Sequence, residues 1–437
     1  MPKTHVNIEI SFANQGLTHY GGLYLLQQFF QRIKLRSALT QSIRFQQLNN
    51  RYSVSDSILA IVYPIILGLG RIETNILLQQ NGVFQHLASL PTYPNPTTLR
   101  RFLDRFGSRG LTAFQNLHDR FRNYFLREPD PLSSIIFDLD TKVLTVYGQQ
   151  QGARVGFNPK KRGRPSYQPL LCFEGKTGDI WEGIYLSGDI HPAPHTIEIL
   201  GKSVSKLPSG IREIRVRADS AFYDHTIAEY LQEMPAFYAI VARITKPIQR
   251  YFAGLSYEEI SPGIWLAEFE YKPWRWKITQ RFIVVRRLLP EKPSWQLSLF
   301  KMTGYTYHVI VTNLSLKPLN LWRFYNQRAT GDLIIRELLE AYTLGKIPTR
   351  DWASNQGYFQ LVLFAYNLIN WFKRLCLPDD WQQLNLQTVR NRLLVVPAQL
   401  LRAQGKRILS LPNSYPYSAT FMQILKNINK LPPENYS

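Results

Sequence analysis

The sequence predicts an α/β protein with a helical N-terminal region and a β-rich segment inserted late in the chain. Up to about residue 128, apolar residues recur at helical spacing. From residue 132 onward, β-branched apolar runs alternate with helical segments, which is the pattern of a layered α/β architecture. From about residue 247 to 313 we expect only short strands, and beyond residue 319 we expect helices again.

The charge balance favours a polyanionic partner. The 437 residues contain 52 lysines and arginines against 31 acidic residues, which gives a net charge of +21. An excess of this size is typical of proteins that bind nucleic acid. An anionic membrane is the second candidate, and a merely soluble basic protein is the third. The hydrophobic content of 45% is sufficient for a large core and argues against disorder.

The two cysteines, Cys172 and Cys376, indicate no disulfide framework and suit a reducing cytoplasm. The N-terminal segment lacks the apolar core of a signal peptide. The longest apolar stretches, residues 58–70 and 361–372, are shorter than the roughly 20 residues that span a bilayer. We therefore expect two buried helices, no membrane association and a cytoplasmic location.

The N-terminal region offers one candidate DNA-binding helix. Helices are predicted over residues 23–33 and 54–69, and Ser53 or Ser55 is expected to cap the second. Another helix starts near Pro96 and carries Arg100 and Arg101, so it is a candidate to lie along a DNA groove. An ordinary surface helix with arginines explains the same pattern equally well.

The central region is expected to alternate strands and helices. Residues 133–140 and 142–148 are interpreted as paired strands, and residues 172–186 as a hairpin that turns at residues 176–178. Further on, a helix at 196–207, a strand ending at Asp219, a helix at 225–234 and a strand at 236–244 follow. In the β-rich segment we expect strands near residues 263–271, 281–289, 294–300 and 305–314. The segment 386–409 is interpreted as a basic helix broken at Pro397.

Two aspartates close strand-like runs. Asp140 ends one run, Asp138 precedes it by two residues and points to the same face, and Asp219 ends another run. Phosphodiester chemistry without a covalent enzyme intermediate uses two divalent ions roughly 3.5–4 Å apart, and carboxylates are the ligands that Mg²⁺ prefers. In a basic protein, these residues are candidate metal ligands. A lone aspartate at a strand end is more often a turn residue or a helix cap.

A third acid, Asp332, lies on a predicted helix. If that helix is continuous, Tyr325, Arg328, Asp332 and Arg336 point within about 40° of one direction. This face combines a carboxylate for a metal with arginines for phosphates. Glu337 points about 140° away, so it is a poor substitute for Asp332.

The strongest basic loop surrounds Gly163 and is a candidate to enter a minor groove or follow phosphates. Its cations are Lys160, Lys161, Arg162 and Arg164. A competing metal site, zinc held by His191 and His195, is disfavoured because Pro192 and Pro194 argue against the helix that this spacing requires, and because no third ligand is near in sequence.

Together these motifs resemble a DDE transposase of a bacterial insertion sequence, a class with a ribonuclease H-like core and a β-rich insertion before the last acid. FDLDT is similar to the family's first-acid motif and selects Asp140 over Asp138 by the threonine that follows. RVRADSAFY is similar to the second-acid motif at Asp219. YNQRATGDLIIREL resembles the third-acid signature Tyr-x(2)-Arg-x(3)-Glu-x(6)-Lys at Asp332. The stretch from Tyr147 to Leu171 is similar to one typical of a subgroup.

The third motif departs from the signature at two positions. Asp332 stands where the family has glutamate, and Leu339 stands where it has lysine. The resemblance implies that Tyr325 and Arg328 contact DNA near the scissile strand, and Arg336 is the remaining cation on that face. We expect the shorter carboxylate still to bind metal, directly or through water.

The resemblance implies a division into five parts. These are a helical DNA-binding domain (1–128), a ribonuclease H-like core in two parts (129–246 and 316–385), a β-rich insertion (247–315) and a basic helical tail (386–437).

The resemblance also implies the cofactor and the partner. Asp140, Asp219 and Asp332 would hold two Mg²⁺ ions, with Mn²⁺ as a substitute. The expected partner is double-stranded DNA, both inverted repeats and target, bound by a homodimer. The alternatives are a metal-dependent nuclease without strand transfer and an inactive DNA-binding derivative.

Overall fold

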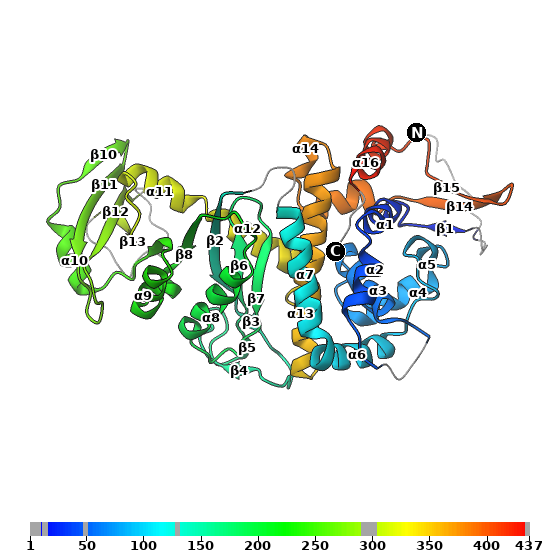
Figure 1. Cartoon of the computed structure of the whole chain (residues 1–437), viewed down its shortest axis with the longest axis horizontal. Helices are drawn as coiled ribbons and strands as arrows, with labels where there is room; N and C mark the ends of the chain where they lie inside the picture. The colour runs from blue at the N-terminus through cyan, green and yellow to red at the C-terminus, as the bar shows by residue number, and fades with distance from the viewer. Residues whose placement is uncertain (1–9, 11–15, 47–50, 127–131, 290–303, 433–437) are drawn as a thin grey trace, which may run out of the picture.

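The computed structural model describes residues 10, 16–46, 51–126, 132–289 and 304–432. Figure 1 shows an elongated molecule in which one large sheet runs from a β-rich end to the middle and helices build the other end. The mixed α/β class predicted from the sequence is therefore confirmed. The expected strand at residues 294–300 lies outside the described residues.

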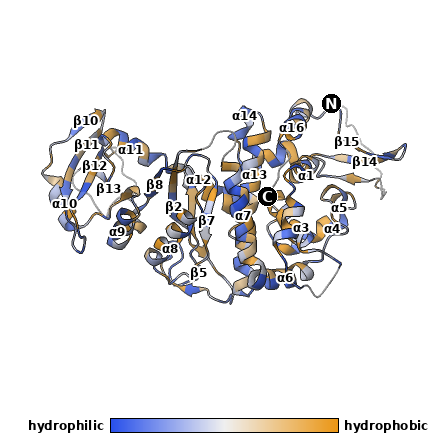
Figure 2. Cartoon of the chain, viewed as in Figure 1, coloured by the Kyte–Doolittle hydropathy of each residue, from blue (hydrophilic) through white to orange (hydrophobic). Residues whose placement is uncertain are grey.

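The helical end is built by N-terminal helices that pack on one long C-terminal helix, α13 (Trp352–Cys376). Ser53 caps α3, since its side chain accepts from Asp56 N at 3.0 Å while Asp56 accepts from Ser53 N. Apolar residues of both regions share one core, and Figure 2 shows them along α13 and its neighbours. The N-terminal helices are α1 (Leu23–Arg32), α2 (Leu35–Ser42), α3 (Val54–Leu67), α4 (Ile76–Gln80), α5 (Phe84–Leu87), α6 (Pro96–Arg105) and α7 (Leu111–Leu126), with short turns η1 (Ile72–Asn75) and η2 (Phe106–Gly110).

The expected burial of both long apolar stretches is confirmed, because α3 and most of α13 are buried inside the protein. Within the described ranges, no single helix is long and apolar enough to cross a membrane. α3 and the following segment, Ile72–Gln80, pass that test only as a pair, and they are bent by 102° from each other.

The central sheet has the strand order β10-β11-β12-β13-β9-β8-β2-β6-β7. β2 pairs in parallel with β8 and antiparallel with β6, and β8 pairs in parallel with β9. Helices α8 (Pro192–Ser205) and α9 (His225–Glu233) connect these strands, which confirms the expected alternation. The strands here are β2 (Ser134–Thr141), β6 (Leu170–Glu174), β7 (Ile180–Ile184), β8 (Glu213–Ala218) and β9 (Phe237–Val241).

The β-rich segment extends this same sheet. β13 pairs with β9 over Ile310↔Val241 to Thr312↔Ala239, so the inserted strands continue the hydrogen-bonded ladder. The segment begins with a helix, α10 (Lys246–Ala253), where we expected none. Pro247 fits its first turn, where the amide N–H has no intrahelical acceptor. The inserted strands are β10 (Glu258–Ser261), β11 (Ile264–Tyr271), β12 (Gln280–Leu288) and β13 (Tyr305–Thr312).

Two expectations for the core are wrong. Residues 142–148 do not pair with β2, because β6 and β8 already occupy both edges of that strand. Instead β3 (Leu144–Thr145) joins β5 (Pro165–Tyr167) and β4 (Arg154–Val155) in a small separate sheet. α8 begins at Pro192, four residues earlier than expected, because both prolines lie in its first turn, where no N–H is needed.

The interpretation of the C-terminal region as a basic helix is also wrong over residues 398–410. β14 (Ala398–Ala403) and β15 (Lys406–Ser410) form a hairpin, and β1 (Leu17–Thr18) pairs with β14. The loop contains only Gln404 and Gly405, whose φ angles of 49° and 74° match the positive values that a two-residue hairpin turn requires. Remaining helices are α11 (Pro318–Asn326), α12 (Ala329–Glu340), α14 (Asp379–Gln382), α15 (Leu386–Val389) and α16 (Ser418–Lys430), with turns η3 (Ser220–Phe222) and η5 (Arg390–Leu394). The five-part division stays a prediction.

Candidate active site

The sheet places two of the three predicted acids side by side. β2 and β8 run parallel, and their register ends at Leu139↔Ala218. The next residues along the two strands are Asp140 and Asp219. Both carboxylates therefore stand at the same edge of the sheet, where the rigid strands hold them.

Asp219 is held in position by the turn that follows β8. Its Oδ1 atom accepts a hydrogen bond from Ala221 N at 2.9 Å and caps the short helix η3. The side chain is half-buried, so part of the carboxylate faces solvent. The residue thus combines a capping role with the accessibility that a metal ligand needs.

Asp140 is the buried member of the group. Thr141 N donates to its Oδ1 at 2.7 Å, and Arg328 Nη2 lies 3.3 Å from its Oδ2. The pKa of Asp140 is raised to about 7, chiefly by burial; the guanidinium of Arg328 lowers it, and the carboxylates of Asp219 and Asp332 raise it. Three negative charges that influence one another in this way are the chemical setting in which a divalent cation binds.

Asp138 has a different role. It is buried, and Arg217 donates to it twice, from Nε to Oδ1 at 2.6 Å and from Nη2 to Oδ2 at 2.7 Å. Arg217 Nη1 also donates to Phe324 O at 2.7 Å. Asp138 is thereby occupied by a structural ion pair, which supports the choice of Asp140 as the first acid.

Asp332 lies in the first turn of α12 and is exposed. The continuous helix that we expected from Tyr325 to Arg336 is wrong, since α11 ends at Asn326 and α12 begins at Ala329. The hydrogen bonds Arg328 N to Tyr325 O (2.9 Å) and Gly331 N to Arg328 O (2.8 Å) join residues three apart. This tighter turn breaks the helix axis.

Tyr325 and Arg328 nevertheless converge on the acids. Both side chains are buried, and Arg328 Nη2 donates to Leu139 O at 2.9 Å. Burial raises the pKa of Tyr325 to about 12; Arg328 opposes the shift, and the carboxylate of Asp219 adds to it. Arg328 thus acts as the counter-charge of Asp140, and its contact with DNA remains a prediction.

The structure shows the surroundings of Leu339, which replaces the lysine of the third-acid signature, and of the charged residues near Asp332. Leu339 is half-buried and packs against the main core, which explains how an apolar residue is accommodated there. Glu337 accepts a hydrogen bond from Leu386 N at 2.6 Å, so it anchors the C-terminal region and does not replace Asp332. Arg336 is exposed one turn beyond Asp332.

The basic loop between β4 and β5 is exposed at all four of its cations, Lys160, Lys161, Arg162 and Arg164. Gly163 has a φ of 75°, and Arg164 N donates to Lys161 O at 3.2 Å to close the turn. Arg164 also lies over the ring of Tyr147, 5.9 Å from its centroid. The loop is therefore shaped as an accessible cationic turn.

The two candidate arginines of α6 differ in availability. Arg100 is paired with Glu73, whereas Arg101 is exposed. Of the two, Arg101 is the better placed to meet a phosphate, and the DNA contact of both remains a prediction.

Sequence reasoning missed Arg217. An arginine in a strand that is otherwise buried needs a partner, because an unpaired buried charge is very costly. The alternation in RVRAD places Arg217 on the same face as Asp219, one strand away from Asp138. That pattern is the signal from which the ion pair was predictable.

The histidines do not form a metal site. His191 accepts from Ala193 N at 3.3 Å and caps α8, while His195 pairs with Glu198 at 2.9 Å. In the part of the chain that the structure describes, no three His, Cys, Asp or Glu side chains are arranged to hold a metal ion as they stand. For the three acids the donor chemistry fits a divalent ion, since they would supply carboxylate oxygens, and those of Asp219 and Asp332 are partly open to solvent.

Comparison with known proteins identifies the family of the chain. The family model described as "Transposase DDE domain group 1" matches residues 1–433. No curated protein was found to match the chain. One similar solved structure is the piggyBac transposase synaptic complex with hairpin DNA, with 12% identity, a TM-score of 0.48, and coverage of 97% of this chain and 86% of that one. Because the family model spans nearly the whole sequence, the chain belongs to the transposase DDE domain group 1 family.

Proposed function

We propose that this protein is the transposase of a bacterial insertion sequence and that Asp140, Asp219 and Asp332 form its catalytic centre. The observation that carries the proposal is the position of Asp140 and Asp219 at adjacent ends of parallel strands. Asp332 adds a third carboxylate, whose charge raises the pKa of Asp140. The strand order β7-β6-β2-β8-β9, with β6 antiparallel, supports a ribonuclease H-like core.

In this proposal the three carboxylates hold two Mg²⁺ ions, or Mn²⁺, which would activate the attacking oxygen and neutralise the leaving one. Asp140 provides a buried carboxylate whose position is set by Thr141 N. Asp219 and Asp332 provide the more accessible carboxylates. Arg328 balances their charge, and Arg336 and the basic loop would bind the DNA strand.

The reaction would proceed in two steps. Water attacks a phosphodiester at the element end and leaves a 3′-OH, and that hydroxyl then attacks a phosphodiester of target DNA. Each step exchanges one P–O bond for another, so no external energy source is required. Because two ends must be joined to one target, we propose a homodimer on DNA, acting in the bacterial cytoplasm at the nucleoid.

A strand-transfer assay distinguishes this function from its alternatives. Element-end duplexes, either intact or already carrying the free 3′-OH, would be incubated with Mg²⁺ and a supercoiled plasmid. A transposase joins both substrates to the plasmid. A nuclease cuts the intact end but leaves the plasmid unjoined, and an inactive derivative binds both duplexes without any product.

The Asp332 position gives a separate prediction. We expect Asp332→Ala to slow cleavage by at least about hundredfold, because it removes a metal ligand, while Asp332→Glu stays within about tenfold of the wild type. Gel quantification of cleaved end DNA measures both. A large gain in Asp332→Glu would show that the native aspartate is a defect, and an unchanged rate in Asp332→Ala would remove the residue from the catalytic centre.

A further inference from the structure

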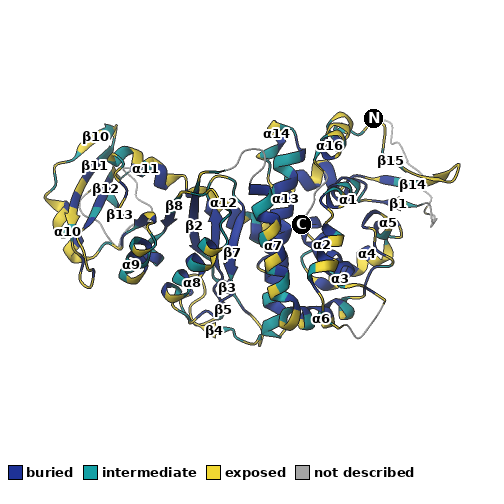
Figure 3. Cartoon of the chain, viewed as in Figure 1, coloured by how far each residue is buried: buried dark blue, intermediate teal, exposed yellow. Residues whose placement is uncertain are grey.

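The β14–β15 hairpin protrudes from the helical end of the molecule. Figure 1 shows it far from the β-rich end, with the central sheet between them. Residues Leu401 to Ile408 are all exposed, as Figure 3 shows for the tip. The cross-strand pair Leu401 and Ile408 is 40% and 47% exposed, so this face of the tip is largely open to solvent.

The tip concentrates positive charge without compensation. Arg402 and Arg407 are direct cross-strand partners, and Lys406 is paired with Ala403. Like charges placed directly opposite destabilise a hairpin. Within the described ranges none of the three cations makes an ion pair, and no Asp or Glu occurs between Asp380 and Glu434 in the sequence. This arrangement costs stability unless an anion binds.

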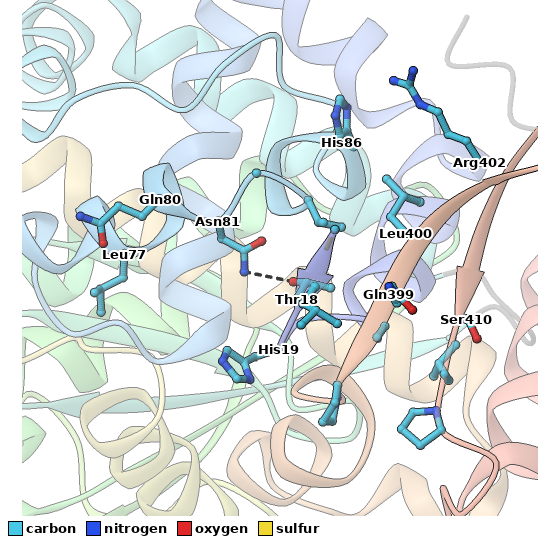
Figure 4. A pocket seen from close by; sticks show the side chains of 18 residues that line it. Thr18, His19, Leu77, Gln80, Asn81, His86, Gln399, Leu400, Arg402 and Ser410 are labelled. Carbon is cyan, nitrogen blue, oxygen red and sulfur yellow. Dashed lines mark hydrogen bonds between the residues drawn. The ribbon is translucent and has the colours of Figure 1, made fainter. Parts of the chain in front are cut away.

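The two arginines share a face with Leu400 and Leu409, and that face turns toward the body of the protein. There they line two adjoining pockets with His86, whose pKa is lowered by burial and, next, by Arg407 and Arg402. The larger pocket has a volume of about 1200 Å³, and Figure 4 shows Arg402 and His86 on the same side of it. The cations therefore flank an open hollow.

We infer that the β14–β15 hairpin is a second DNA-binding element, in which Arg402 and Arg407 bind backbone phosphates of double-stranded DNA away from the cleavage site. A two-stranded ribbon fits a DNA groove, and arginine binds phosphate oxygens through two donors. The inference rests on the proposed function for the identity of its ligand. Such contacts position the duplex and do not read its sequence.

The test compares Arg402→Gln/Arg407→Gln with a matched control, Lys426→Gln/Lys430→Gln, which removes two exposed cations from α16. Fluorescence anisotropy would measure binding to two duplexes. The long one reaches from the three acids to the hairpin, and the short one covers only the three acids. On the long duplex we expect the hairpin variant to bind about tenfold more weakly, with a salt slope shallower by about 2. On the short duplex the affinity of the hairpin variant should equal that of the wild type. The affinity of the control variant should equal that of the wild type on both duplexes.

Equal weakening in the hairpin variant and the control, or weakening on the short duplex as well, would overturn the inference. Folding is not at risk, because loss of the repelling pair should leave the melting temperature unchanged or higher. The outcome is separable from the proposed function. A wild type that never cleaves DNA, yet binds the long duplex in a hairpin-dependent way, would overturn the proposed function and support the hairpin.

Discussion

Replacing Asp140 with asparagine is expected to abolish DNA cleavage and, at pH 8, to stabilise the free protein. Asparagine removes a metal ligand but retains the size of the side chain and can still accept from Thr141 N. It also removes a carboxylate whose pKa burial raises from 3.8 to about 7. A shift of this size corresponds to about 4 kcal/mol as an upper bound.

The sign of the pH dependence follows from that shift. Well below pH 4 the carboxyl group is protonated in both the folded and the unfolded state, so it does not change the free energy of unfolding. As the pH rises from about 4 to about 7, the unfolded state releases the proton first and gains stability relative to the folded state. The advantage of Asp140→Asn should therefore grow over this interval and stay constant above it.

Urea unfolding in a metal chelator at pH 4 and at pH 8 measures this effect. We expect Asp140→Asn to match the wild type at pH 4 and to exceed it by about 2–4 kcal/mol at pH 8. Asp138→Asn is the control: burial raises the pKa of this carboxyl too, but the change breaks the paired hydrogen bonds from the fully buried Arg217, so it should destabilise the protein. If Asp140→Asn were less stable than the wild type at pH 8, the carboxylate would not be the strained group described above.

The second large effect is expected at Arg217. This side chain is fully buried and joins Asp138 on β2 to Phe324 O at the end of α11. Arg217→Met leaves the carboxylate of Asp138 buried without a partner, which typically costs about 3–5 kcal/mol. Because the same arginine connects α11 to the sheet, cleavage should fall as well.

Chemical denaturation of two further variants isolates the cause. Asp138→Leu/Arg217→Met should recover much of the lost stability, because it removes both charges together. Arg281→Met breaks the more exposed pair with Glu268, 2.6 Å long, and should cost about 1 kcal/mol or less. A similar cost for Arg217→Met and Arg281→Met would contradict the importance of the buried pair.

The sequence predicts the acids better than it predicts the framework that brings them together. The positions of Asp140 and Asp219 were predictable because aspartates at the ends of neighbouring parallel strands lie at the same edge of the sheet. The contact of Arg328 with Asp140 was not, because it depends on a helix break at residues 327–328 that no proline or glycine marks at that point. Helical periodicity assumes one continuous helix, whereas here hydrogen bonds between residues three apart interrupt it.

The C-terminal hairpin was predicted as a helix because its local sequence pattern fits both kinds of structure. The run LLVVPAQLLRAQGKRIL contains leucines that fit a helix as well as a strand. The decisive feature is the turn at Gln404–Gly405, because both residues adopt positive φ and pair Ala403 with Lys406. Pairing of β14 with the distant β1 then completes a three-stranded sheet, and a contact so remote in sequence is not visible in local patterns.

The central claim, that three carboxylates and a divalent metal cleave DNA, is tested most directly at Asp219. Asparagine keeps the side-chain oxygen that accepts from Ala221 N, so the turn after β8 should persist. We predict that the wild type nicks element-end DNA only when Mg²⁺ is present and leaves a 3′-OH. Asp219→Asn should bind the same DNA equally well but cleave it at least about a thousandfold more slowly. Equal cleavage by both proteins, or cleavage in a metal chelator, would contradict the account.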